Sequence, residues 1–352
     1  TNWLSTAINK RIKRIMAYIS FQPNDYFNTK LYTGNGSTQN ITGVGHQVDW
    51  TWIKHRTDTE GHGLFDVLRG ALYRLQSNSD SVSSSQAGTV TAFGSDGFSL
   101  GNNAEVNANN GSYVSWNWKA GTTGSGTSTG SGTGKAYSYS VSTTSGFSIV
   151  KYVGNGTAGH TIPHHLGAVP KMLITKNLGR GEHWRVYHSS LGNANKLNLN
   201  NDTASASATE WNSTTPTSSV FSIGTGEQIN YNDDNYIAYC FAEKKGFSKF
   251  GKYNGLGTTT GQFVYTGFKP AFVMTKIATT GGSDTGGWVM LNNKSYPNNL
   301  SNSPVLFANG TYAESDSYNG EMFSNGFRFN ANSVTVNGSG NSYIYMAFAE
   351  SP

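Results

Sequence analysis

The chain has 352 residues and a net charge of +5, but only 13% of its residues are charged and 43 are glycine. That charged fraction is about half that of an ordinary soluble domain. The basic residues are scattered outside one cluster near the N-terminus, so the basic groove of a nucleic-acid-binding protein is not expected. No apolar run approaches the roughly 20 residues that span a bilayer, so membrane insertion is not expected either. Many Gly, Ser, Thr, Asn, Tyr and Phe residues suit short strands joined by tight turns, which predicts an all-β protein.

Residues 1–26 differ in pattern from everything that follows. Their apolar side chains recur at helical spacing, with lysines and arginines on the remaining surface. The apolar positions are Leu4, Ile8, Ile12, Ile15, Met16 and Ile19. This pattern predicts a short basic amphipathic helix that serves as an anchor. Such a helix could lie on a membrane, pack on the body of the protein or bundle with copies of itself in an oligomer, and the last two are favoured.

An internal repeat begins after this segment. The stretch "YTGNG" that starts at Tyr32 returns as "YVGNG" at Tyr152 and as "YNGLG" at Tyr253. An apolar run closed by a lysine follows each of them after 22, 24 and 23 residues, at Lys54, Lys176 and Lys276. A later phenylalanine and tyrosine are separated by 15, 15 and 16 residues, in the pairs Phe98 and Tyr113, Phe221 and Tyr236, and Phe327 and Tyr343. The chain therefore contains three copies of one unit.

Each unit is predicted to be a β-sandwich of the jelly-roll type, with about 100 residues and two sheets around a shared core. Gly- and Asn-rich pieces fit hairpin turns, and the segments between them alternate as strands do. The predicted units are residues 27–119, 146–245 and 246–352. In the third unit, the strand around Tyr345 is apolar on both faces, so we expect it to be covered on both sides.

The connections between units are predicted to differ. Residues 120–145 contain the Gly/Ser/Thr tract "AGTTGSGTSTGSGTGKA", which predicts a flexible connector or an ordered loop against a neighbour. The join at "EKKGFSKF" is short, so the second and third units should be rigidly docked and the first more independent.

One cysteine and three histidines are the candidates for a thiol or metal site. The lone cysteine, Cys240, lies in the apolar run "YIAYCFAE" and is expected to be a buried structural thiol. His160, His164 and His165 form the histidine cluster of the chain. They lack nearby cysteines or well-placed carboxylates, so a solvated turn is favoured over a metal site, and no cofactor is expected.

Catalytic patterns are not apparent in the sequence. No nucleophile elbow or phosphate-binding loop is present. Acidic residues exist that could form a glycosidase pair, but no pair stands out by spacing. They are Asp66, Asp96, Glu182, Asp233, Asp234 and Glu321. We expect no enzymatic activity and assign no catalytic residue, and the ligand-binding residues are unknown.

Tryptophans are candidate sugar-binding groups, because their flat apolar faces cover pyranose rings. Trp184, Trp211 and Trp288 could serve in this way. Those in the repeated strands are predicted to be core residues, namely Trp50, Trp52, Trp116 and Trp118.

Several long segments, among them "HGLFDVLRG", "GHTIPHHLGAVPKMLITKN" and "YIAYCFAEKKGFSKFGKYNG", resemble a family of repeated β-domains. This family occurs in tail-fibre-like and other virion structural proteins of tailed phages, notably marine phages and those infecting cyanobacteria. The resemblance covers about residues 27–351. It implies a virion structural protein, a tail fibre or surface appendage that takes part in assembly and host attachment on the outside of the particle.

Other functions stay open. A capsid decoration or head-fibre protein is a close variant, a free-standing carbohydrate-binding adhesin belongs to a different class, and a polysaccharide depolymerase is a third option. The expected partners are copies of the chain in a homo-oligomer, with a trimer as one option, and other virion proteins through the N-terminal helix. A host surface glycan is a further candidate partner.

Overall fold

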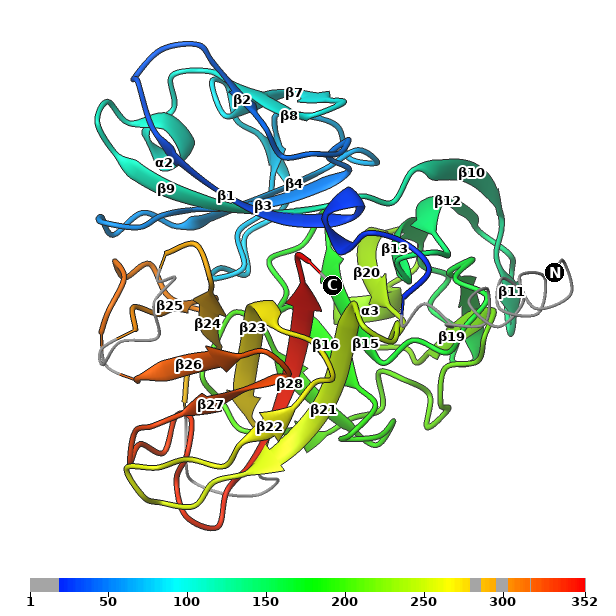
Figure 1. The fold of residues 1–352 in the computed structure, drawn as a ribbon. Coiled ribbons are helices and arrows are strands. Elements are labelled where there is room, and N and C mark those ends of the chain that lie inside the picture. Colours follow the sequence, from blue (N-terminus) through cyan, green and yellow to red (C-terminus); the bar gives the residue numbers. More distant parts are fainter. Residues whose placement is uncertain (1–18, 279–285, 296–302, 317, 352) are drawn as a thin grey trace, which may run out of the picture.

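The computed structural model describes residues 19–278, 286–295, 303–316 and 318–351 (Figure 1). Strands dominate, with one 3-10 turn, η1 (Pro23–Asp25), and two short helices, α2 (Ala104–Asn107) and α3 (Glu227–Asn230). The all-β prediction is confirmed. Most of the predicted N-terminal helix lies outside the described residues. Within them, Ile19 and Phe21 are partly buried against the core.

The first unit, residues 27–119, has a large and a small antiparallel sheet. The large sheet runs β1 (Phe27–Thr33), β9 (Ser112–Trp118), β3 (Trp50–His55), β4 (His62–Asp66). The small sheet runs β2 (Gln39–Thr42), β8 (Gly97–Leu100), β7 (Val90–Gly94). A two-stranded ribbon joins β5 (Tyr73–Arg74) to β6 (Ser84–Ser85).

Among the residues that the structure describes, the second unit, residues 120–245, contains the most strands. Its large sheet runs β10 (Thr122–Thr127), β12 (Ala136–Ser142), β13 (Phe147–Val153), β20 (Asn235–Phe241), β15 (Met172–Asn177), β16 (Arg185–His188), β17 (Asn195–Asn198), β18 (Ala206–Ser207). Its small sheet runs β11 (Thr129–Gly130), β14 (His160–Pro163), β19 (Val220–Ile223).

The third unit, residues 246–352, repeats the arrangement of the first. Its large sheet runs β21 (Ser248–Asn254), β28 (Ser342–Ala349), β23 (Pro270–Ile277), β24 (Val289–Asn292), β25 (Leu306–Phe307). Its small sheet runs β22 (Val264–Tyr265), β27 (Gly326–Phe329), β26 (Gly320–Phe323). In all three units, the strand that contains the repeated tyrosine pairs with the last strand of the unit, and that last strand pairs in turn with the strand that contains the repeated lysine.

The predicted connector between the first two units is wrong in part, because residues 120–145 contain the strands β10, β11 and β12. Gly124 and Gly126 of β10 pair with Tyr139 and Tyr137 of β12. A Cβ atom on either glycine would lie 2.5 or 2.8 Å from the hydroxyl of its partner tyrosine. The tyrosine rings thus cover a strand that has no apolar side chains of its own.

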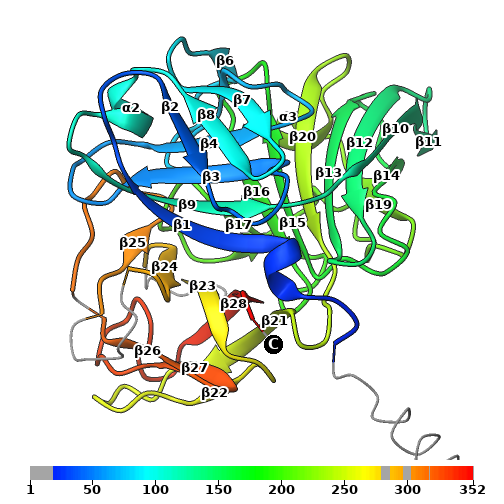
Figure 2. The ribbon, with the colours of Figure 1, turned by 45° about the horizontal axis from the view of Figure 1, so that its top comes forward.

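Each large sheet has one face on a core of its own unit and the other on a core shared by all three units. The units surround this common core (Figures 1 and 2). Trp50 of the first unit stacks on Tyr239 of the second, with ring centroids 4.3 Å apart. Phe348 of the third unit lies 5.2 Å from Phe27 of the first and 5.9 Å from Phe241 of the second. The prediction of a more independent first unit is therefore wrong.

Equivalent side chains also donate hydrogen bonds across the unit boundaries. The three bonds run from Trp184 to the Gln76 carbonyl, from Trp288 to the Asn198 carbonyl and from His62 to the Phe307 carbonyl, at 2.9, 2.8 and 2.9 Å. In the first unit His62 pairs with Lys54. In the other two units Trp184 and Trp288 come one residue before the strand residues that pair with Thr175 and Thr275, so they occupy the corresponding position beside Lys176 and Lys276. Trp52 donates to Nδ1 of His62, so Nε2 carries the proton and donates. The second unit thus bonds to the first, the third to the second and the first to the third.

The repeated "Y-x-G-x-G" motif is structural in every copy. Its tyrosine stacks on the tyrosine of the last strand, with centroids 5.0 Å apart in each unit. The first glycine allows close approach to a backbone carbonyl, since a Cβ atom would lie 2.1 to 2.3 Å from that oxygen in Gly34, Gly154 and Gly255. The motif therefore fixes the loop that precedes the last strand.

Candidate functional site

A groove of about 430 Å³ lies between the first and second units. The first unit contributes Arg69 and Tyr73 to its wall. The second unit contributes Lys151 from β13 and Asp233 and Asp234 from the turn before β20. This groove combines charged groups from two units with an aromatic ring, so a free acid, base or nucleophile among its side chains would make it a candidate active site.

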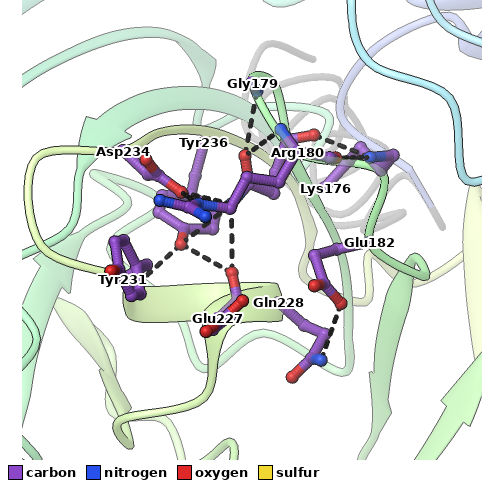
Figure 3. A network of polar contacts seen from close by, with 10 residues as sticks. Lys176, Gly179, Arg180, Glu182, Glu227, Gln228, Tyr231, Asp234 and Tyr236 are labelled. Carbon is purple, nitrogen blue, oxygen red and sulfur yellow. Dashed lines mark hydrogen bonds and ion pairs between the residues drawn. The ribbon is translucent and has the colours of Figure 1, made fainter.

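The carboxylates of the groove are already paired. Arg180 Nε lies 2.5 Å from Asp234 Oδ2, and its guanidinium stacks 3.9 Å from the centre of the Tyr231 ring (Figure 3). Lys135 Nζ lies 2.5 Å from Asp233 Oδ1. Of the described cations on the groove wall, Lys151 makes no salt bridge. The groove can therefore offer one free ammonium group to a ligand, but it has no free acid and base pair.

A polar network that includes Gly179 and Asp234 of the groove wall holds the loop between β15 and β16 (Figure 3). Asn177 Oδ1 accepts from the backbone N–H groups of Gly179 and Arg180 at 2.9 and 3.0 Å. Its Nδ2 donates to Asp234 Oδ2 at 2.8 Å and to the Tyr236 hydroxyl at 3.1 Å. These bonds are satisfied within the protein, so the network supports the loop rather than presenting reactive groups.

A buried lysine is the last residue but one of the equivalent strand in each unit. Lys54, Lys176 and Lys276 are fully buried, and each ammonium group donates to two backbone carbonyls at 2.5 to 3.1 Å. Burial lowers the pKa to about 8 for Lys54 and Lys176 and to about 7 for Lys276. Sequence reasoning used these lysines only as repeat markers and missed their role. The sequence feature that could have indicated this role is a lysine that follows an apolar run at nearly constant spacing in all three copies.

The histidine cluster does not form a solvated turn, so that prediction is wrong. His160 is buried between the Ser128 hydroxyl and the Asn155 amide, each 2.9 Å from a ring nitrogen. His164 is buried with its Nε2 at 3.1 Å from the Thr217 carbonyl. His165 stacks on Tyr139 instead, with centroids 3.7 Å apart. The three imidazoles thus have separate partners. Across the described part of the chain, no three His, Cys, Asp or Glu side chains are grouped to hold a metal.

The acidic candidates are distributed over the three units. Asp66 is buried against Arg69, with Nε 2.6 Å from Oδ2. Asp96 accepts from the Gly43 and Gly45 N–H groups at 2.9 and 2.6 Å, and these bonds lower the pKa of its carboxyl. The remaining acids bind neighbours in the same way, with Glu182 accepting from Gln228, Glu321 from Arg328, and Asp233 and Asp234 paired as described above.

The tryptophan predictions divide into two outcomes. Trp184, Trp211 and Trp288 are 0%, 1% and 1% exposed, so their predicted role as a sugar-binding surface is wrong. Their indole N–H groups donate to backbone carbonyls, which explains how they can be fully buried. The core role of Trp50, Trp52, Trp116 and Trp118 is confirmed, as is the burial of Cys240, which raises the pKa of its thiol.

No curated protein and no solved structure shows significant similarity to this chain. Among the described residues, no helix is long and apolar enough to cross a bilayer. One family does match, over residues 22–352, and it is described as a domain of unknown function, DUF7483. Since this match extends over nearly the whole sequence, the chain belongs to the DUF7483 family.

Proposed function

We propose that this chain is a structural component of a tailed-phage virion, a tail fibre or comparable surface appendage that takes part in assembly and host attachment. One observation carries the structural role: three units close around one shared aromatic core and are bonded to each other in turn. Such a body resists bending between its parts, because separating any two units would expose buried aromatic surface. The virion location rests on the sequence resemblance.

The groove supports a binding or structural role over an enzymatic one. Its carboxylates are paired with Arg180 and Lys135, so neither is available as a general base without breaking an ion pair. We propose that the chain acts without catalysis and without a cofactor. Residues 1–26 would then hold it to other virion proteins or to sister chains in a homo-oligomer, with a trimer as one option.

Labelling of intact particles tests the location. Antibodies raised against residues 22–352 should mark the tail or its appendages when particles of the encoding phage are viewed by immunogold electron microscopy. Label over the head would instead assign the chain to a capsid decoration or head-fibre protein, within the same class. Particles without label and without peptides of this chain in their mass spectrum would overturn the proposal.

Sedimentation of the purified protein tests the assembly role. The full chain should form an oligomer, and a chain that begins at residue 22 should be monomeric, because the body already closes within one chain. A full chain that is monomeric at every concentration would remove the proposed role of residues 1–26.

A further inference from the structure

The outer face of the small sheet in the third unit carries a group of exposed aromatic side chains. Phe263 immediately precedes β22 and is 43% exposed, and Tyr265 is the last residue of β22 and is 62% exposed. Phe323 of β26 is half-buried, and its ring meets Phe263 edge-on with centroids 5.6 Å apart. Val264, between the first two, points inward to the core of the unit. We call Phe263, Tyr265 and Phe323 the aromatic platform.

The floor and rim of the platform come from β27. Gly326 pairs with both Tyr265 and Phe323, and a Cβ atom there would lie 2.2 Å from the Val264 carbonyl oxygen and 2.6 Å from the Phe263 ring, so the backbone and this ring both pack closely on the glycine. Arg328 lies two residues further on and binds Glu321, with Nη2 2.6 Å from Oε2. Its guanidinium also lies 5.3 Å from the centre of the Phe323 ring. The rim is therefore polar but without net charge.

The other two units show that the fold does not require these rings. The strand registers equate Val264 with Ile41 in the first unit and Ile162 in the second, since each pairs with the repeated phenylalanine. The positions of Phe263 and Tyr265 are then occupied by Asn40 and Thr42 in the first unit and by Thr161 and Pro163 in the second. The position of Phe323 is occupied by Gly94 in the first unit. Polar or small residues therefore suffice for the same sheet face, and the aromatic side chains need another reason.

We propose that the aromatic platform binds a neutral saccharide, which stacks its pyranose faces on Phe263 and Tyr265. This inference rests on the host-attachment part of the proposed function and gives it a ligand class. Flat apolar faces in a polar surround suit pyranose rings, whose C–H faces are apolar and whose edges form hydrogen bonds. Arg328 and Glu321 neutralise each other, so the site favours an uncharged sugar over a uronic or sialic acid.

The size of the platform favours a saccharide over a second copy of the chain. An aromatic side chain has roughly 150–250 Å² of surface. The exposed fractions of the platform residues therefore sum to a few hundred Å², whereas a stable protein interface needs about 800 Å² on each side. The platform is also on the side of the third unit that faces away from the shared core, where a long polymer can approach.

The test replaces two residues of the aromatic platform by the residues at the equivalent positions of the first unit. The variant F263N/Y265T should keep the fold, because Asn and Thr occupy these positions in the first unit, and circular dichroism and thermal melting check this. Y312T is the matched control, since Tyr312 is 65% exposed and lies outside the platform. The full chain is measured by NMR saturation transfer and affinity electrophoresis against neutral hexasaccharides of glucose, mannose and galactose, with polygalacturonate as the charged counterpart.

We expect at least one neutral glycan to bind, with a loss of tenfold or more in F263N/Y265T and a change of less than twofold in Y312T. Failure of the folded wild-type chain to bind any neutral glycan would overturn the inference, as would binding that F263N/Y265T leaves unchanged. Preference for polygalacturonate, or self-association that depends on Phe263 and Tyr265, would also overturn it. These readouts use the isolated chain, so they are independent of the particle labelling that tests the virion role.

Discussion

Lys276 is the most strongly perturbed of the three buried lysines, and its ammonium group joins two units by donating to the carbonyls of Asp202 and Gly286 at 2.9 and 2.7 Å. Burial lowers its pKa from 10.5 to about 7. Between these two values, the unfolded chain binds more protons at this residue than the folded chain does. The linkage relation then makes the free energy of unfolding rise with pH across that window and level off below about pH 7.

The variant K276M should therefore flatten the pH dependence of stability. Urea unfolding at intervals from pH 7 to pH 9.5 should show a smaller rise than in the wild type. The variant should also be less stable by about 1–3 kcal/mol at pH 9.5, because two buried carbonyls lose their donor. K269M is the control, since Lys269 is exposed. A pH slope in K276M equal to that of the wild type would show that Lys276 does not titrate in this range.

The turn between the repeated tyrosine and the small sheet contains the glycines of the repeated motif. Gly255 faces the Gly338 carbonyl so closely that a Cβ atom would lie 2.1 Å from the oxygen. We expect G255A to lower the free energy of unfolding by about 1–3 kcal/mol, the usual effect of overpacking. The matched change G181A should have little effect, since a Cβ atom on Gly181 has no neighbour nearer than 3.9 Å. Equal urea midpoints for the two variants would contradict this account.

Other elements show where sequence patterns are informative and where they fail. The repeated markers predicted which strands correspond, because each tyrosine, glycine and lysine has the same packing task in every unit. They could not predict β10, whose apolar cover comes from Tyr137 and Tyr139 on the neighbouring strand. They also misplaced Trp184 and Trp288, because the carbonyl that each buried indole N–H binds belongs to another unit.

At the scale of the whole molecule, the sequence repeat predicted that the chain has three units, but it did not predict how they are arranged around one shared core. The informative signal was the last strand of the third unit, which was predicted to be covered on both faces. In the structure, Tyr345 faces the core of its own unit, whereas Met346 and Phe348 face the shared core. If the three sandwiches were independent tandem domains, the outer face of that strand would be exposed to solvent and would carry polar residues. The aromatic platform likewise could not be predicted from the sequence. Its residues are recognised as unusual only when the strand registers show that the equivalent positions of the first unit carry Asn40, Thr42 and Gly94.

The shared core predicts that the three units unfold together. In W288F, the indole N–H that donates to the Asn198 carbonyl of the second unit is lost, whereas in W211F a bond to Asn195 within the second unit is lost. Each loss should lower the free energy of unfolding by about 1–3 kcal/mol. Only W288F should speed amide hydrogen exchange along the boundary between the second and third units. Wild type and both variants should nevertheless show one urea transition, with a slope that reflects unfolding of the whole body. Separate transitions for the units in the wild type would mean that the shared core does not couple them.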